Sequence, residues 1–273
     1  MPKMKKFVAA AVIAPLIAPP LFAEQQDPAR DQARSMVMTQ YGIVATSQAV
    51  ASRAGAAILA KGGSAVDAAI AANAALGVIE PMMNGVGGDL FAIVYDAKAK
   101  RLYGLNASGW APKKLSVEAL QEKGLSKMRT VDLVTVPGTV AGWDTLHQRW
   151  GKLSMAQELA PAIAMAERGI AVTETDADNW KIYGTPFLNN PEFARVFLPD
   201  GKAPAAGQLF KNPELAETLR LIGEHGRDGF YKGQTAAAML KLEGELGGFM
   251  EADDLTEFHP ELGRSCKHHL SVP

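Results

Sequence analysis

The stretch that decides the fold is Ala45 to Pro81, ATSQAVASRAGAAILAKGGSAVDAAIAANAALGVIEP. Its small apolar residues follow helical spacing in two segments, and Gly62 and its neighbour separate them, as glycines do where helices end. Ser64 followed by Asp67 has the pattern of a capping box at the start of the second segment. The sequence therefore predicts two consecutive helices, the first over about 48–61, with small side chains that allow close packing.

A glycine-rich turn, Asn84 to Asp89 (NGVGGD), comes next, and two short β-prone segments follow it at 90–95 and 101–105. The polar turn between these segments predicts a hairpin. The glycine-rich turn lacks the Lys-Ser/Thr pair of a phosphate-binding loop, and it precedes a strand where such a loop precedes a helix. We interpret it as a tight backbone passage.

Beyond the loop 106–112 the sequence is mainly helical. Ser154 with Gln157 forms a second capping-box pattern, and Asn212 followed by Pro213 is a favourable helix start. No Pro/Ser-rich linker and no internal repeat divide the chain. These observations predict one helix-rich domain with few strands.

Composition excludes several classes of partner. The 273 residues carry a formal net charge of −1, which gives no broad attraction to nucleic acid. The single cysteine, Cys266, cannot form an internal disulfide, and no Cys/His spacing matches a zinc site. We expect neither a metal nor a cofactor.

The first residues have the pattern of a secretory signal. Lysines begin the chain, an apolar run interrupted by prolines extends from Phe7 to Phe22, and the small residue Ala23 precedes polar sequence. This predicts a signal peptide at 1–23, a flexible lead-in at 24–40, and a periplasmic or secreted protein. An uncleaved anchor is the alternative, but the run is shorter than the ~20 residues that a stable membrane span needs.

No complete catalytic set is visible from the residues alone. None of the five histidines stands in a recognisable triad pattern, and no G-x-S-x-G elbow is present. His147 and His225 fall on predicted helices, where we interpret them as surface or structural residues.

Several blocks in one order resemble the γ-glutamyltransferase (glutathione hydrolase) family. The first is the stretch quoted above, and the resemblance covers roughly residues 40–260. The later blocks are NGVGGDLFAIVYD from Asn84, VPGTVAGW from Val136, LAPAIAMAERGI from Leu159, and GQLFKNPELAETL with GRDGFYKG between Gly207 and Gly233.

The resemblance implies an α+β fold, the αββα sandwich of the N-terminal-nucleophile hydrolases, of which this chain would be an incomplete, helix-rich large-subunit portion. Family precursors cleave themselves, and a threonine then begins the small subunit and attacks a γ-glutamyl amide with its own α-amino group as base. The implied activity is therefore that of an amide hydrolase or acyltransferase on small γ-glutamyl or related amides. The catalytic threonine would lie beyond the end of this chain, so a missing small subunit is the expected partner.

The loop after the hairpin departs from the family. The resemblance places an Arg-Glu pair there, whose arginine holds the substrate α-carboxylate, but alignment on Ala111-Pro112 puts Ser108 and Gly109 at the pair. A serine can donate one hydrogen bond and supplies no charge, unlike a bidentate arginine. Ser108, Gly109 and Asn106 are our candidate substrate-binding residues, and an acylase for a non-γ-glutamyl amide is an alternative function.

The family likeness covers 41–261 and stops near Glu261, so residues 262–273 (LGRSCKHHLSVP) form a non-family tail. One back-translation with a single base removed after Glu261 reads EWVDPVSTTYR, which resembles the family. This motivates the hypothesis of a frameshifted or truncated reading. The remaining alternative is a catalytically inactive exported fragment or binding protein on the same scaffold.

Overall fold

The computed structural model describes residues 36–264. The predicted signal peptide, most of the lead-in and most of the tail, including Cys266, lie outside the described residues. The chain separates into two compact units after Met38, and all helices and strands belong to the unit that begins at Thr39.

The first two helices form as predicted. Helix α1 spans Ala49–Ala60 and α2 spans Ala65–Ile79. The capping box is present: Asp67 N donates to Ser64 Oγ at 3.1 Å, and Ser64 N donates to Asp67 Oδ2 at 2.7 Å. A Cβ at Gly55 of α1 would lie 2.8 Å from the backbone oxygen of Ala68 in α2, so small residues are required for this close helix pair.

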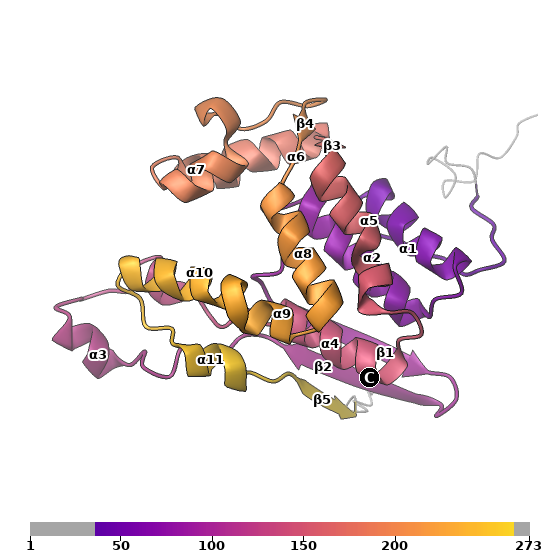
Figure 1. The fold of residues 1–273 in the computed structure, drawn as a ribbon, viewed down its shortest axis with the longest axis horizontal. Helices are drawn as coiled ribbons and strands as arrows, with labels where there is room; N and C mark the ends of the chain where they lie inside the picture. The colour runs from indigo at the N-terminus through magenta and orange to yellow at the C-terminus, as the bar shows by residue number, and fades with distance from the viewer. Residues whose placement is uncertain (1–35, 265–273) are drawn as a thin grey trace, which may run out of the picture. The chain divides into compact units, whose positions relative to one another are not determined.

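The predicted hairpin is confirmed, and it belongs to a sheet of order β1-β2-β5 (Figure 1). Strand β1 (Leu90–Asp96) pairs antiparallel with β2 (Arg101–Ala107). Strand β5 (Glu261–Arg264) pairs with the other edge of β2 and was not predicted. It is too short and too polar to give a strand pattern, and its conformation comes from backbone pairing with β2.

Seven further helices surround the hairpin and its neighbours. Helix α4 (Thr139–Trp150) packs on the hairpin, and α5 (Met155–Arg168) begins at the predicted capping box of Ser154 and Gln157. Helix α8 (Pro213–His225) packs along α5. The others are α3 (Val117–Glu122), α9 (Asp228–Tyr231), α10 (Gly233–Glu245) and α11 (Ala252–Glu257), with a short 3₁₀ turn, η2, at Val131–Leu133.

The segment between α5 and α8 has short elements that the sequence did not predict. A two-residue strand β3 (Ile170–Ala171) pairs with β4 (Leu209–Phe210). Trp180 Nε1 donates to the backbone oxygen of Phe197 at 2.7 Å and fixes the segment internally. Its helices are α6 (Glu174–Asn179), the π turn η3 (Trp180–Gly184), the 3₁₀ turns η4 (Thr185–Phe187) and η5 (Pro199–Gly201), and α7 (Pro191–Phe197).

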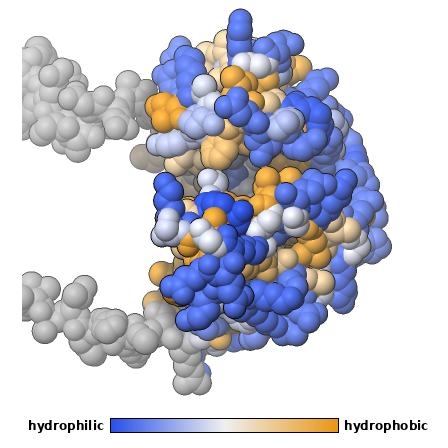
Figure 2. Space-filling view, turned by 90° about the vertical axis from the view of Figure 1, so that its left-hand side faces the viewer, coloured by the Kyte–Doolittle hydropathy of each residue, from blue (hydrophilic) through white to orange (hydrophobic). Residues whose placement is uncertain are grey.

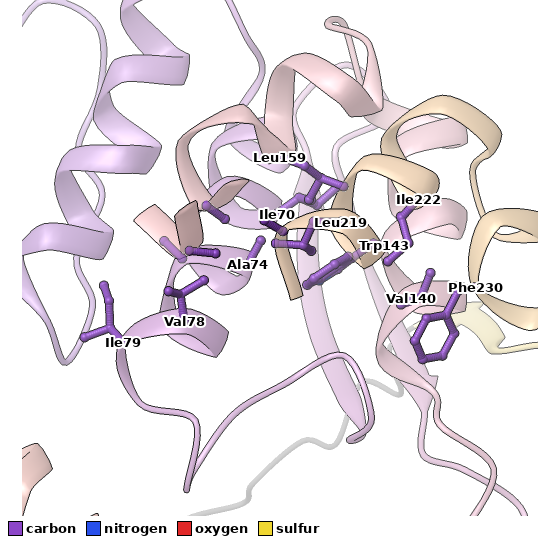
Figure 3. Close-up of a cluster of buried hydrophobic side chains, with 14 of the residues drawn as sticks. Ile70, Ala74, Val78, Ile79, Val140, Trp143, Leu159, Leu219, Ile222 and Phe230 are labelled. Atoms are coloured by element: carbon purple, nitrogen blue, oxygen red, sulfur yellow. The ribbon is translucent and has the colours of Figure 1, made fainter. Parts of the chain in front are cut away.

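The core joins the helices to one face of the sheet. Figure 3 shows Ile70 of α2, Trp143 of α4, and Leu159 and Leu219 of α5 and α8 in one buried cluster. Trp143 also donates its indole N–H to the Asn73 side chain at 2.9 Å, so its polar atom is satisfied.

The sheet face that points away from the helices carries exposed apolar side chains. Phe91, Ile93 and Tyr95 alternate along β1 and are all exposed. Large apolar side chains grouped on one sheet face indicate a surface that another layer can cover. Among residues 36–264, no helix is both long enough and apolar enough to cross a bilayer.

Candidate functional site

Three segments meet beside the amino end of β1 and form what we call the crossing. They are the glycine-rich turn 85–89, the loop 106–110 that follows β2, and the segment 135–139 that leads into α4. The hairpin register brings the first two together, because Leu90 lies opposite Ala107.

Backbone hydrogen bonds lock the third segment to the other two. Gly138 N and Thr139 N both donate to the Gly88 oxygen at 2.9 Å. Val136 N donates to the Trp110 oxygen at 2.9 Å. These bonds connect residues that are far apart in the sequence, so the crossing is held by the backbone and not only by side chains.

All three predicted substrate-binding residues lie in the crossing. Ser108 N donates to Asn106 Oδ1 at 2.9 Å, which shapes the loop. Ser108 Oγ donates to Asp89 Oδ2 at 3.2 Å, and Gly109 N donates to Asp89 Oδ1 at 2.9 Å. The structure therefore brings the three together and adds Asp89, which sequence reasoning missed. The hairpin register could have found it, because the residue before Leu90 must lie opposite Ser108.

Asp89 decides the charge of this site. Its side chain is exposed, and none of the ion pairs formed within residues 36–264 includes it. Because the Ser108 hydroxyl donates to Asp89, that proton is engaged within the protein. The crossing thus offers a solvent-facing carboxylate where a positive charge would be needed to hold a carboxylate ligand.

Two glycines permit the close approach of the backbones. A Cβ at Gly109 would lie 1.8 Å from the Val136 oxygen, and a Cβ at Gly138 would lie 1.9 Å from the Ala107 oxygen. Neither distance is tolerated by a real Cβ. This requirement is a physical reason for glycine at both positions.

A buried tyrosine forms hydrogen bonds to the backbone of the segment that leads from the crossing into α4. Tyr231 of α9 donates its hydroxyl proton to the Pro137 oxygen at 2.6 Å and accepts from Ala141 N at 3.1 Å. Burial raises the pKa of the Tyr231 hydroxyl, so this group stays protonated at neutral pH.

An open groove of about 560 Å³ lies next to the crossing and shares Pro137 with it. Figure 2 shows the face that carries α7 and α10, with a hollow bordered by hydrophobic residues. None of Asn106, Ser108 and Gly109 lines the groove. Its walls are Arg129, Thr130, Val131, Val134, Pro137, Phe187, Asn190, Met239, Leu242, Glu243, Leu246 and Met250.

The fold, a helix-backed hairpin whose glycine-rich turn meets the loop after β2, places the chain in the class of N-terminal-nucleophile hydrolases. Within this class the family model described as Gamma-glutamyltranspeptidase matches residues 51–272, and the chain belongs to that family.

Curated relatives support this family membership. The chain is 36% identical over 222 residues to the glutathione hydrolase-like YwrD proenzyme of Bacillus subtilis, which covers 81% of this chain and 42% of that protein. It is 34% identical over 247 residues to the glutathione hydrolase proenzyme of the same organism, covering 88% and 42%. The matched part of the chain therefore spans about two fifths of the length of these relatives.

Solved structures give the same result. The Helicobacter pylori gamma-glutamyltranspeptidase superposes with a TM-score of 0.77 at 29% identity, covering 84% of this chain and 67% of that one. A cephalosporin acylase from Bacillus halodurans superposes with a TM-score of 0.75 at 36% identity, covering 85% and 46%.

The predicted family and fold class are confirmed by these comparisons. The matched range continues past Glu261 to residue 272, and the first residues after Glu261 form part of β5. The domain boundaries, including a separate tail at 262–273, stay predictions. The substrate-binding role of Asn106, Ser108 and Gly109 also stays a prediction, although their proximity is now observed.

Proposed function

We propose that this chain is the large-subunit portion of an exported amide hydrolase or acyltransferase that acts on γ-glutamyl or related amides. The family match over residues 51–272 carries this proposal, together with the candidate residues gathered in the crossing. The relatives named as proenzymes are more than twice as long as the matched segment, which supports a second portion supplied by a small subunit.

The chemistry proposed for the assembled protein is that of an N-terminal threonine. Its α-amino group takes the proton of its own hydroxyl, the oxygen attacks the amide carbonyl, and the amine leaves with a proton. Water then releases the acyl group, or an amine acceptor takes it. This chain would position the substrate at Asn106, Ser108 and Gly109 and needs no cofactor for these steps.

The exposed sheet face supports the need for a second portion. Phe91, Ile93 and Tyr95 present apolar surface on the side of β1 away from the helices. In the proposed assembly a second sheet covers this face, which removes the apolar side chains from water.

The test begins with the DNA that follows the Glu261 codon. We expect it to encode a segment led by a threonine, and we expect the chain produced with that segment to release nitroaniline from a γ-glutamyl anilide. The chain alone is expected to release none. Turnover by the chain alone, or a locus without a threonine-led segment, would contradict the proposal.

A second candidate, an acylase for amides whose acyl group carries no α-carboxylate, is favoured by Asp89. The carboxylate of Asp89 faces solvent and holds Ser108 Oγ and Gly109 N at 3.2 and 2.9 Å. A substrate carboxylate brought to this loop would meet a like charge and no arginine, and like charges at short range repel. The similarity to the cephalosporin acylase structure is compatible with this candidate.

The two candidates predict different responses to Asp89→Asn in the assembled protein. If the acyl group carries a carboxylate, removing the negative charge lowers KM for a γ-glutamyl anilide severalfold. If it carries none, KM for a neutral acyl anilide changes little. Ser108→Ala is the matched control, because it removes the hydroxyl contact to Asp89 and leaves the charge in place.

We also propose a periplasmic or secreted location, which rests on the pattern of residues 1–23. Fractionation of cells that express the tagged chain, followed by mass spectrometry of its first residue, tests this. An intact Met1 in the cytoplasmic fraction would contradict it.

A further inference from the structure

Three polar side chains from three helices meet in the interior, away from the crossing. They are Asp67 of α2, His147 of α4 and Glu158 of α5, and each offers an atom within 4.8 Å of the others. Asp67 and Glu158 are 0% exposed, and the His147 side chain is 25% exposed. None of the three has a role in the proposed reaction.

Asp67 is surrounded by donors. Its carboxylate accepts from Ser64 N at 2.7 Å, from Lys152 N at 3.1 Å and from Leu153 N at 3.3 Å. Burial favours the neutral acid, but the hydrogen bonds from Glu158 and from these backbone groups prevail and lower the pKa of Asp67. Asp67 is therefore the ionised member of the cluster at neutral pH.

Glu158 has an incomplete set of partners if it is ionised. Its Oε1 lies 2.8 Å from His147 Nδ1, but its Oε2 is buried and has no donor among the described residues. An ionised Glu158 would also place a second buried negative charge beside Asp67. Burial, followed by the hydrogen bond with Asp67 and its charge, raises the pKa of Glu158 to about 9.

Within residues 36–264, no lysine or arginine forms an ion pair with Glu158. Arg220 of α8 pairs with Glu167 and Glu217 instead, and Arg53 of α1 is exposed. Lys152 contributes its backbone N–H to Asp67. On α4, Asp144 accepts from Gln148 one turn before His147. His147 is thus the only titratable group besides Asp67 that contacts Glu158 within residues 36–264.

The geometry favours a proton over a metal ion at this position. Two ligands of a tetrahedral Zn²⁺, each about 2.1 Å from the metal, would be about 3.4 Å apart. His147 Nδ1 and Glu158 Oε1 are 2.8 Å apart, which is a hydrogen-bond distance. Both oxygens of Asp67 already accept backbone hydrogen bonds.

We propose that Glu158 is a neutral acid whose Oε2 proton bonds to Asp67 while its Oε1 accepts from His147 Nδ1, so that one proton clasps α2, α4 and α5 together. This arrangement gives both oxygens of Glu158 a partner, including Oε2, which has none if Glu158 is ionised. It also ties together the ends of α2 and α4 that lie away from the crossing. The chain runs from α2 into the crossing and leaves the crossing into α4.

The clasp makes stability depend on pH in a defined direction. The pKa of Glu158 is raised in the folded chain, so the native state holds one proton more than the unfolded state between about pH 5 and pH 9. The stabilising contribution of Glu158 is fully present below its pKa in the unfolded chain. It is lost as the pH rises through its pKa in the folded chain. Over this window the unfolding equilibrium constant rises about tenfold per pH unit from this group alone.

The test is Glu158→Gln in the 273-residue chain, with urea unfolding measured from pH 5 to pH 9. Glutamine mimics the neutral acid, because its NH₂ can donate to Asp67 and its oxygen can accept from His147. We expect the ratio of wild-type to variant unfolding constants to rise by roughly tenfold per pH unit. The control Glu122→Gln, at an exposed position of α3, is expected to leave the ratio constant.

A charged Glu158 paired with a charged His147 gives the opposite result, a variant that is less stable than wild type and loses most at neutral pH. That outcome would overturn the proposal. A second measurement needs no variant to fold: infrared spectra of the wild-type chain with ¹³C-labelled glutamate should contain a protonated carboxyl band at pH 7 that disappears near pH 9. Its absence at pH 7, or saturable binding of one Zn²⁺ that Glu158→Gln abolishes, would also overturn it.

Discussion

Replacing Gly109 with alanine is expected to destabilise the chain by about 3 kcal/mol, because the added Cβ would lie 1.8 Å from the backbone oxygen of Val136. Two backbone segments must separate to admit it. The hydrogen bond from Gly109 N to Asp89 at 2.9 Å, and that from Val136 N to Trp110 at 2.9 Å, would be strained or broken by this movement. The effect thus falls on the candidate site as well as on global stability.

Gly138→Ala tests the close approach of two backbone segments on the other side of the crossing. Its Cβ would lie 1.9 Å from the Ala107 oxygen, and its φ of −101° is ordinary for any residue, so the close contact alone causes the expected loss. Urea unfolding followed by circular dichroism measures the change in both variants.

Matched controls separate crowding from the general effect of removing a glycine. A Cβ at Gly104 of β2 or at Gly87 of the glycine-rich turn has nothing within 4 Å. Alanine at either position should change the free energy of unfolding by no more than about 0.5 kcal/mol. If Gly109→Ala behaves like Gly104→Ala, the crossing is looser than described and cannot fix a substrate.

Local sequence signals predicted the elements that depend on local interactions. The Ser64 capping box and the Asn212-Pro213 start gave correct helix beginnings, because a cap is a contact between residues three apart. The hairpin β1–β2 followed from apolar runs on either side of a polar turn. Ser108 was selected by alignment on Ala111-Pro112, and its role in substrate binding stays a prediction.

Elements that depend on contacts between residues far apart in the chain could not be predicted from local sequence patterns. Strand β5 exists because residues after 260 pair with β2, more than 150 positions earlier in the chain. Asp67 was assigned only its local capping role, yet it also accepts from Lys152 and lies beside Glu158. Asp89 was passed over because its partners, Ser108 and Gly109, reach it only through the hairpin register.

Tyr231→Phe is expected to cost about 2–4 kcal/mol although it removes a single oxygen atom. The Tyr231 hydroxyl donates to the Pro137 oxygen at 2.6 Å and accepts from Ala141 N at 3.1 Å, and Tyr231 is buried. Phenylalanine would leave both backbone groups in the interior without a partner. An unpaired buried polar group costs about 1–3 kcal/mol, because it loses water and gains nothing in return.

Loss of the Tyr231 hydroxyl is also expected to loosen the crossing, because Tyr231 contacts the first turn of α4. Ala141 N is one of the first N–H groups of this helix, which have no partner inside the helix, so the tyrosine acts as a cap supplied from α9. Loss of the cap should increase amide exchange at Ala141 and at Gly138 and Thr139, whose N–H groups hold the Gly88 oxygen. Hydrogen exchange measured by mass spectrometry on peptides from 136–143 would detect this.

Tyr183→Phe is the matched control, because Tyr183 is exposed. It should change stability by no more than about 0.5 kcal/mol and leave exchange in 136–143 unaltered. Equal effects of the two substitutions would mean that the hydroxyl of Tyr231 is replaced by water without loss. In that case α4 would not need α9 to fix its first turn, and the rigidity of the crossing would have to come from its own backbone bonds and from Gly109 and Gly138 alone.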